Sequence, residues 1–431
     1  MPENIFVSHE VVLVNHTLRK INKISVVDWF LYLTFFLVYE LSATIYDLPN
    51  SDILRWVVCF LLIGRDLFIS CSRYKGKYNL LPSEYVFLLF PLIIQSFWNP
   101  SMISTTLSRS LSFIIYSMAI YSFFRRPGIT SERILRTFNL FCGVMVFVVL
   151  PLNILSINRV SFHGDYVGIY DNRNMTVSVL GRIYTILCFC LVKSKRKVLL
   201  LTVTGVTVYL IFLTHSRVAI VIAIVVTAFV YIIYSAKTDF KRSIRVLLFI
   251  LFALVFIPFL GERFNIVSIN RVLGSYTGVA ETGLMRTSLW KLGLELFKQK
   301  PLFGWGHNVV YYNTFVLKIP GWGVHNSYLI MLIEGGIAGF LCYMGFFISA
   351  FRKCWSDYKI CKKMSGEQKI RDLVMFCAAM CLILFINGFS ESFLFSAGNL
   401  MALPFWFCYM GCRMYLQKKK IELREQGMVI A

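Results

Sequence analysis

The sequence predicts an all-α, polytopic membrane protein. Its 431 residues are 57% hydrophobic and only 15% charged, whereas charged residues make up about a quarter of a typical soluble domain. Apolar runs recur from residue 26 to the C-terminus, and most approach the roughly 20 residues that a helix needs to cross a bilayer. These observations predict one integral-membrane domain over residues 1–431.

We expect about twelve spanning helices and one long connection between them. The predicted spans are 26–46, 53–71, 84–98, 110–126, 133–155, 175–192, 197–214, 216–235, 245–261, 326–350, 371–390 and 396–415. The segment 262–325, between the ninth and tenth spans, is the long connection. If both termini are cytoplasmic, every predicted inner loop is basic, as in "KSKRK". The positive-inside rule therefore explains most of the net charge of +22, and no nucleic-acid partner is needed.

Several chemistries are missing from the sequence. There is no Walker loop, no HExxH pair, no Asp-x-Asp cluster and no nucleophile elbow. All twelve cysteines fall in predicted spans or inner loops, and none forms a CxxC pair. We therefore expect no metal site and no disulfide framework. The N-terminus lacks the features of a cleaved signal peptide, so the first span is expected to act as its own signal.

A few arginines on the predicted outer side break the charge pattern. Arg217 follows a very short turn and begins a span, with Ser216 as the expected cap. Arg286 is expected in the first turn of an amphipathic helix that Pro301 ends. Helix N-termini bind anions, and guanidinium groups suit diphosphates. Arginines elsewhere on this side, such as Arg173, can instead reach lipid headgroups.

A histidine, His325, precedes the span that starts near Asn326. A helix N-terminus disfavours the protonated imidazole, and a neutral imidazole can act as a general base. A capping or anchoring role is the alternative. Glu334 lies nine residues further on, which places it on the opposite helix face and about 13 Å deeper. We therefore expect it to pair with another helix. Gly335 and Gly339 predict close packing beside it.

Four blocks of sequence, all predicted on the outer side, carry a family resemblance. They are "GIYDNRN" (168–174), "THSRVA" (214–219), "TGLMRTSLWKLGLELFKQKPLFGWG" (282–306) and "HNSYLIMLIEGGIAG" (325–339). In this order they resemble the O-antigen ligase and polymerase superfamily of bacterial surface-polysaccharide assembly. The resemblance covers roughly residues 160–340 by motif and the whole chain by layout.

The resemblance implies a GT-C-like glycosyltransferase of the bacterial inner membrane whose site faces the periplasm. Its donor is an undecaprenyl-diphosphate-linked glycan, and transfer inverts configuration without metal, nucleotide or other cofactor. The family roles fall on Arg217 and Arg286, which contact the diphosphate, and on His325, which activates the acceptor hydroxyl. Further candidate substrate contacts are Asn172, Arg173, Asn174 and Asn326. Arg173 departs from the family pattern, which commonly has proline there.

The acceptor distinguishes two enzymes with the same donor chemistry. A polymerase joins repeat units of O-antigen or capsule, whereas a ligase moves the glycan to lipid A–core. We favour the polymerase because the aromatic-rich chain suits a cavity fitted to one repeat unit. A lipid-linked glycan transporter is a more remote alternative, since ionisable residues are expected to concentrate at the outer edge rather than at mid-bilayer. Besides the substrate, expected partners are membrane lipid and chain-length regulators or other polysaccharide-assembly proteins.

Overall fold

The computed structural model confirms the all-α prediction. It describes residues 26–73 (except 43 and 47–49), 83–88 (except 86), 92, 97, 103–124, 131–161, 165–193 (except 171), 196–235 (except 215), 279–312 (except 308), 324–363, 368–389, 391 and 403–425. Within these residues the regular elements are helices, accompanied by an isolated β-bridge between Val160 and Tyr166.

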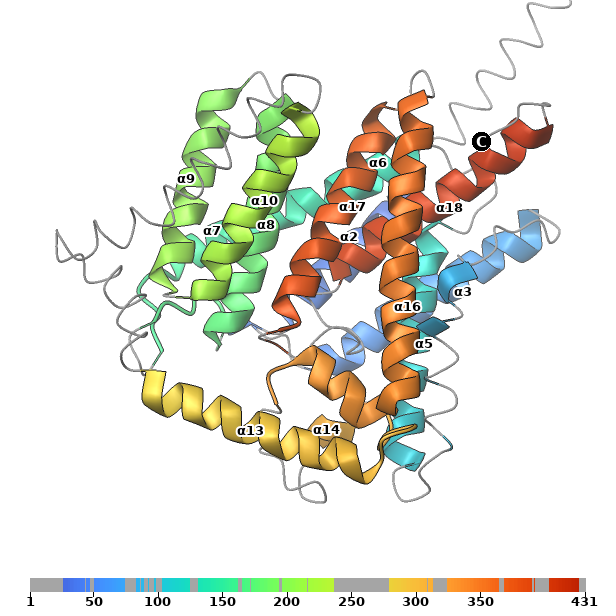
Figure 1. Ribbon diagram of the computed structural model, residues 1–431. Coiled ribbons are helices and arrows are strands. Elements are labelled where there is room, and N and C mark those ends of the chain that lie inside the picture. The colour runs from blue at the N-terminus through green and yellow to red at the C-terminus, as the bar shows by residue number, and fades with distance from the viewer. Residues whose placement is uncertain are drawn as a thin grey trace, which may run out of the picture.

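The helices form a bundle that is crossed at one end by a single helix, α13 (Figure 1). In chain order they are α2 (Val26–Leu41), α3 (Ser51–Arg73), η1 (Ser83–Tyr85), α5 (Ile103–Phe124), α6 (Ser131–Val144), η3 (Met145–Val149), α7 (Leu150–Leu155), α8 (Arg173–Lys193), α9 (Lys197–Leu213), α10 (Arg217–Ser235), α13 (Val279–Gln299), α14 (Val309–Tyr312), α16 (Ser327–Lys363), α17 (Gln368–Asn387) and α18 (Leu403–Glu425). We refer to the crossed end as the α13 end.

Five helical stretches in the described part are long and apolar enough to span a membrane. They are Ile103–Phe124, Glu132–Leu155, Arg173–Leu191, Ser327–Cys361 and Ile370–Asn387. The chain is therefore a polytopic integral membrane protein. The predicted span 245–261 and most of 84–98 lie outside the described residues, as does much of the connection 262–325. The twelve-span layout thus stays a prediction.

Helix boundaries differ from the predicted spans where polar residues continue a helix. The span predicted at 110–126 begins at Ile103, and the last one, predicted at 396–415, runs from Leu403 to Glu425. Hydropathy marks the apolar centre of a helix, whereas the backbone stays helical into its polar ends. The span predicted at 133–155 contains a π-helical turn, Met145–Val149, just before Pro151. Proline has no N–H to donate to the preceding turn, which accounts for the widened turn there.

Aromatic side chains from distant helices pack together in the core. The ring of Phe407 on α18 lies 5.1 Å from that of Phe36 on α2 and 5.3 Å from that of Phe123 on α5. All three side chains are buried, and their edge-on geometry is favourable for aromatic pairs. In the described helices, much of the aromatic content therefore serves helix packing.

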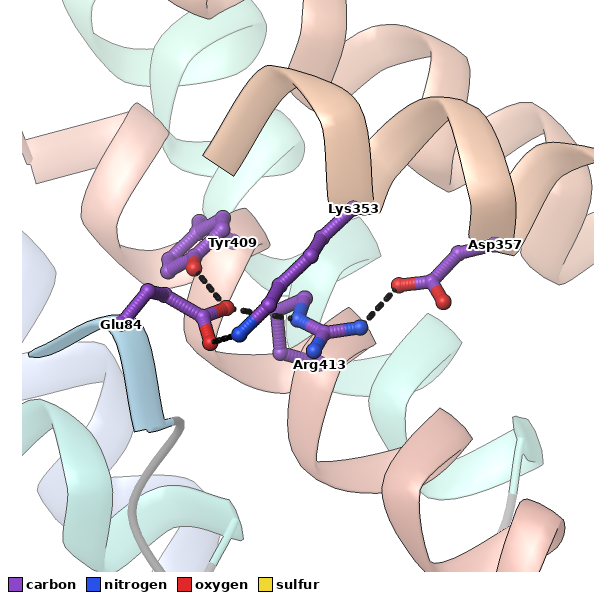
Figure 2. Close-up of polar contacts among 5 residues, drawn as sticks. All are labelled: Glu84, Lys353, Asp357, Tyr409 and Arg413. Atoms are coloured by element: carbon purple, nitrogen blue, oxygen red, sulfur yellow. Dashed lines mark hydrogen bonds and ion pairs between the residues drawn. The ribbon is translucent and has the colours of Figure 1, made fainter. Parts of the chain in front are cut away.

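Charged side chains also join helices inside the bundle. Figure 2 shows Glu84 of η1 accepting hydrogen bonds from Lys353, Tyr409 and Arg413, the last at 2.9 Å. Arg413 also pairs with Asp357, so two carboxylates face two cations. A separate buried pair joins Glu40 on α2 to Arg182 on α8 at 3.0 Å. The expectation that ionisable residues concentrate at the outer edge is therefore incomplete, because Arg182 lies within a spanning stretch.

Candidate functional site

Helix α16 starts where the sequence predicted a helix start, and Asn326 caps it. The Oδ1 atom of Asn326 accepts hydrogen bonds from the backbone N–H groups of Tyr328 and Leu329, both at 3.0 Å. Asparagine is a preferred N-cap because its side chain satisfies N–H groups that the helix leaves open. The oxygen of Asn326 is thus engaged in the cap, although Asn326 was a candidate for substrate contact.

His325 precedes this cap in an unusual backbone conformation. Its φ is 48°, in the left-handed region that costs non-glycine residues roughly 1–2 kcal/mol. The conformation holds the imidazole at the surface of the helix start, with 20% of the side chain exposed. Strain of this kind persists where the surrounding structure fixes it, and it often accompanies functional sites.

A carboxylate that the sequence analysis missed lies beside this histidine. The Nδ1 atom of His325 is 3.5 Å from Oε2 of Glu391, whose side chain is only 8% exposed. Glu391 follows the end of α17 and contacts the start of α16 through its backbone. Its carbonyl oxygen accepts the N–H of Ser327 at 3.0 Å and the Oγ hydrogen of Ser327 at 2.5 Å. The start of α16 and the end of α17 are therefore fastened together around the pair.

Helix α13 packs against the first turns of α16. Trp290 donates its indole N–H to the carbonyl of Val324 at 3.0 Å, one residue before His325. A Cβ on Gly293 would lie 2.8 Å from the Leu329 side chain, so the small residue allows the helices to approach closely. Arg286, which is partly buried, lies one turn before Trp290, on the same side of α13. The site therefore combines an arginine-bearing helix with the histidine.

The predicted position of Arg286 within its helix is wrong. Helix α13 begins at Val279, so Arg286 lies about two turns inside it rather than in its first turn. The polar residues Glu281 and Thr282 belong to the helix instead of preceding it. The anion-binding argument from the helix N-terminus thus does not apply to Arg286, and its predicted phosphate contact stays a prediction.

Arg217 begins α10, as predicted, after α9 ends at Leu213 with Thr214 as its C-cap. The side chain of Arg217 lies outside the described residues, so its predicted phosphate contact stays a prediction. The predicted capping role of Ser216 likewise stays a prediction.

The asparagine-rich block before α8 has local structural roles. Asn172 caps α8, because its Oδ1 atom accepts the N–H of Asn174 at 2.8 Å. Arg173 pairs with Asp165 at 2.5 Å and is 42% exposed. The carbonyl of Asn174 accepts the hydroxyl of Ser178 at 3.0 Å. The contacts that the structure shows for these three residues are with this loop and α8, and none of them is with His325.

Glu334 faces a second histidine rather than His325. Its Oε2 atom lies 4.0 Å from Nδ1 of His307, and its Oε1 atom accepts the N–H of Val310 at 3.2 Å. The expected separation from His325 thus agrees with the structure, and the partner comes from the segment after α13. His307 is buried, and burial together with the charge of Arg109 lowers the pKa of His307 to about 4. Its imidazole is therefore neutral at neutral pH.

The fold and these contacts define an integral-membrane protein with a partly exposed histidine–carboxylate pair at the end of its helix bundle. Such a pair can remove a proton from a hydroxyl group, while a neighbouring arginine can hold an anion. Residues 199–344, about a third of the chain, match the family model described as O-antigen ligase. No match is found among curated proteins. The family match is consistent with the O-antigen ligase/polymerase superfamily and confirms the resemblance that the motifs indicated.

The matched region contains Arg217, Arg286 and His325, and it ends before Glu391. It supports an O-antigen ligase/polymerase-type function, which is a glycosyltransferase-like activity. The first block of the resemblance, at 168–174, lies outside the match.

Proposed function

We propose that the protein polymerises undecaprenyl-diphosphate-linked repeat units of O-antigen or capsular polysaccharide on the periplasmic face of the bacterial inner membrane. The observation that carries this proposal is the His325–Glu391 pair, in which His325 is partly exposed at the start of a spanning helix that packs beside the helix of Arg286. In this proposal His325 acts as a base at the membrane boundary, where a substrate that is half lipid and half sugar would bind.

The proposed reaction is an inverting displacement. The acceptor hydroxyl attacks the anomeric carbon of the donor glycan, and the bond from that carbon to the diphosphate oxygen breaks. Undecaprenyl diphosphate leaves with the bonding electrons, and His325 takes the proton of the hydroxyl. Negative charge grows on the leaving group, so arginines placed beforehand stabilise the transition state. We assign that role to Arg286 and Arg217.

Exposed aromatic side chains beside His325 support a site for sugar chains at the lipid boundary. Trp290 is 38% exposed and Phe389 is 58% exposed, and Phe389 packs with Tyr328 at 4.6 Å between ring centroids. Trp290 and Tyr328 each carry a polar group on an apolar ring, which suits a place that is apolar on one side and wet on the other. Such a surface can fit one repeat unit, which favours the polymerase, whereas ligation to lipid A–core is the alternative with the same donor.

Transport of a lipid-linked glycan is a second candidate because two features are common in transporters. Helix α16 is interrupted at Gly336, and the Glu40–Arg182 pair lies inside the bundle. However, the two charges of that pair contact each other directly and are buried, as in a structural ion pair. We therefore rank transport below transfer.

A deletion strain tests the polymerase proposal in cells. After deletion of the gene, the surface polysaccharide is run on a gel. Single repeat units attached to core indicate a lost polymerase. Long chains that remain unattached indicate a lost ligase, and an unchanged pattern rules out both enzymes.

Purified protein in lipid vesicles separates transfer from transport. Undecaprenyl-diphosphate-linked repeat units are supplied, and the lipid products are followed by mass spectrometry. Transfer releases undecaprenyl diphosphate and lengthens the glycan, whereas a transporter leaves the donor intact. The variant His325→Ala should slow product formation by about 10²- to 10⁴-fold while the protein remains in the membrane. Normal product from this variant would refute the assignment of the base.

A further inference from the structure

The position of Glu391 is fixed from several directions. Its carbonyl holds Ser327 through two hydrogen bonds, and its own N–H donates to Asn387 at 2.9 Å. The N–H of Ser327 also lies 2.8 Å from the carbonyl of Gly388. The end of α17 and the start of α16 thus share one hydrogen-bonded turn, although Ser327 and Glu391 lie 64 positions apart in sequence. These bonds fix the backbone of Glu391 beside the start of α16, and its side chain, which is 8% exposed, reaches His325 from there.

The pairing uses a particular atom of the imidazole. Nδ1 is the ring nitrogen that faces the carboxylate. A neutral imidazole carries its proton on one nitrogen and accepts on the other. A carboxylate beside Nδ1 favours the proton there, so Nε2 is left as the acceptor. The carboxylate also stabilises the imidazolium that forms when Nε2 takes a proton.

We propose that Glu391 is a positioning residue for the transfer reaction: it orients the ring of His325, holds the proton on Nδ1 and so leaves Nε2 to take the proton of the acceptor hydroxyl. The role of Glu391 in catalysis depends on the proposed function. Glu391 does not touch the reacting atoms. After transfer, the proton on Nε2 passes to solvent, and the pair returns to its starting state.

Other charged side chains occur on the elements packed against this end of α16. On α13, Arg286 lies on the side of Trp290, whereas Lys291 and Glu295 are exposed. Within the described part of the chain, Glu391 is the acidic residue that lies within 4.0 Å of His325. The carboxylate of Glu334 instead faces His307. The assignment therefore selects Glu391 among the nearby acids.

Kinetic measurements on purified variants give the first test. Glu391→Ala should lower kcat by about 10²- to 10³-fold with little change in KM for the lipid-linked donor, because binding does not use this carboxylate. Glutamine has the same shape as glutamate without the charge, so Glu391→Gln should lower kcat less than Glu391→Ala does. In a His325→Ala background, Glu391→Ala should cause no further loss, since the two residues act as a unit. Glu132→Gln, at an exposed position of α6, is the matched control.

A second readout does not depend on transfer activity. Diethylpyrocarbonate modifies neutral imidazoles, and peptide mass spectrometry follows its reaction with His325 as a function of pH. In Glu391→Gln, the pH profile of this reaction should differ from that of the wild type, because the imidazole has lost the carboxylate beside Nδ1. The pH–rate profile of transfer should change together with it.

The two readouts distinguish failure of this inference from failure of the proposed function. If the wild-type protein shows no transfer but the modification profile of Glu391→Gln differs from that of the wild type, His325 and Glu391 are paired and the proposed reaction is wrong. If the two modification profiles coincide while Glu391→Gln keeps the melting temperature of the wild type, the positioning role is overturned. A further loss of activity on adding Glu391→Ala to His325→Ala would likewise overturn it.

Discussion

Gly304 and Gly336 occupy reciprocal positions where the segment after α13 meets the break in α16. A Cβ on Gly304 would lie 2.4 Å from the carbonyl of Glu334, and a Cβ on Gly336 would lie 2.4 Å from the carbonyl of Leu302. Both residues have positive φ, 68° and 59° respectively. Each glycine thus admits the backbone of the other segment, which no larger residue could do without displacement.

The hydrogen bonds at this contact are exchanged between the two segments. In an uninterrupted helix, residue 337 would donate to 333 and residue 338 to 334. Here Ile337 donates to Pro301 and Ala338 to Leu302, whereas Trp305 donates to Ile333 and Gly306 to Glu334, at 2.8–3.1 Å. The break in α16 therefore leaves these four groups satisfied and fastens α13 to the helix that carries His325.

Replacing Gly336 by alanine should disrupt this contact. The new Cβ would meet the Leu302 carbonyl, and the backbone at φ 59°, ψ −164° is accessible essentially to glycine alone. We expect a loss of roughly 3 kcal/mol in stability or failure of the protein to accumulate in the membrane. Thermal unfolding in detergent measures the effect. Gly205→Ala in α9 is the control, since a Cβ there meets nothing within 4 Å. Equal melting temperatures for Gly336→Ala and wild type would contradict this account of the break.

Removal of Arg286 should slow transfer without unfolding the protein. Arg286→Ala deletes a cation that the proposed reaction uses in the transition state, and we expect a loss in kcat of about 10²- to 10³-fold. Arg286→Lys keeps the charge but loses the two-pronged geometry, so an intermediate rate is expected. The measurement is release of undecaprenyl diphosphate in vesicles. Arg136→Ala, whose side chain is 46% exposed on α6, should behave like wild type. An unimpaired Arg286→Ala would remove Arg286 from the proposed site.

The sequence predicted the parts of the site that depend on local chemistry. The helix start at His325 could be predicted because Asn326 is a strong N-cap beside an apolar run. Glu391 could not be placed from the sequence, because its distance to His325 depends on how α17 returns to α16. Its position between two predicted spans was the available signal: a carboxylate at the membrane boundary needs a partner. The exchange of backbone hydrogen bonds at Gly336 could not be predicted from the sequence either, because periodicity alone predicts a continuous helix over the "EGGIAG" stretch.

Acidification should destabilise the protein through His307. Burial and Arg109 lower the pKa of this residue from 6.5 to about 4, so the folded state binds fewer protons than the unfolded chain between these two pH values. Stability is therefore complete above about pH 6.5 and is lost as the pH falls towards 4, by on the order of 2 kcal/mol between about pH 7 and pH 5. Melting temperatures in detergent across this range measure the loss.

The variant His307→Gln tests the source of this pH dependence. The glutamine side chain does not titrate in this range, so the fall in melting temperature between about pH 7 and pH 5 should become smaller. His325→Gln removes a partly exposed histidine instead and should leave the dependence due to His307 in place. A wild-type slope in His307→Gln would mean that other groups cause the acid sensitivity.

The network in Figure 2 predicts unequal costs for two substitutions that each remove contacts to Glu84. Arg413→Met deletes the cation shared by Glu84 and Asp357, whose side chains are 0% and 1% exposed. Leaving buried carboxylates without their partner should cost about 3–5 kcal/mol. Tyr409→Phe removes one hydroxyl while Lys353 and Arg413 still neutralise Glu84, so about 1.5–3 kcal/mol is expected. Thermal unfolding should therefore rank Arg413→Met well below Tyr409→Phe, and Arg136→Met at the surface should lose at most about 1 kcal/mol. The reverse order would show that the hydroxyl, rather than the charge balance, holds η1 against α18.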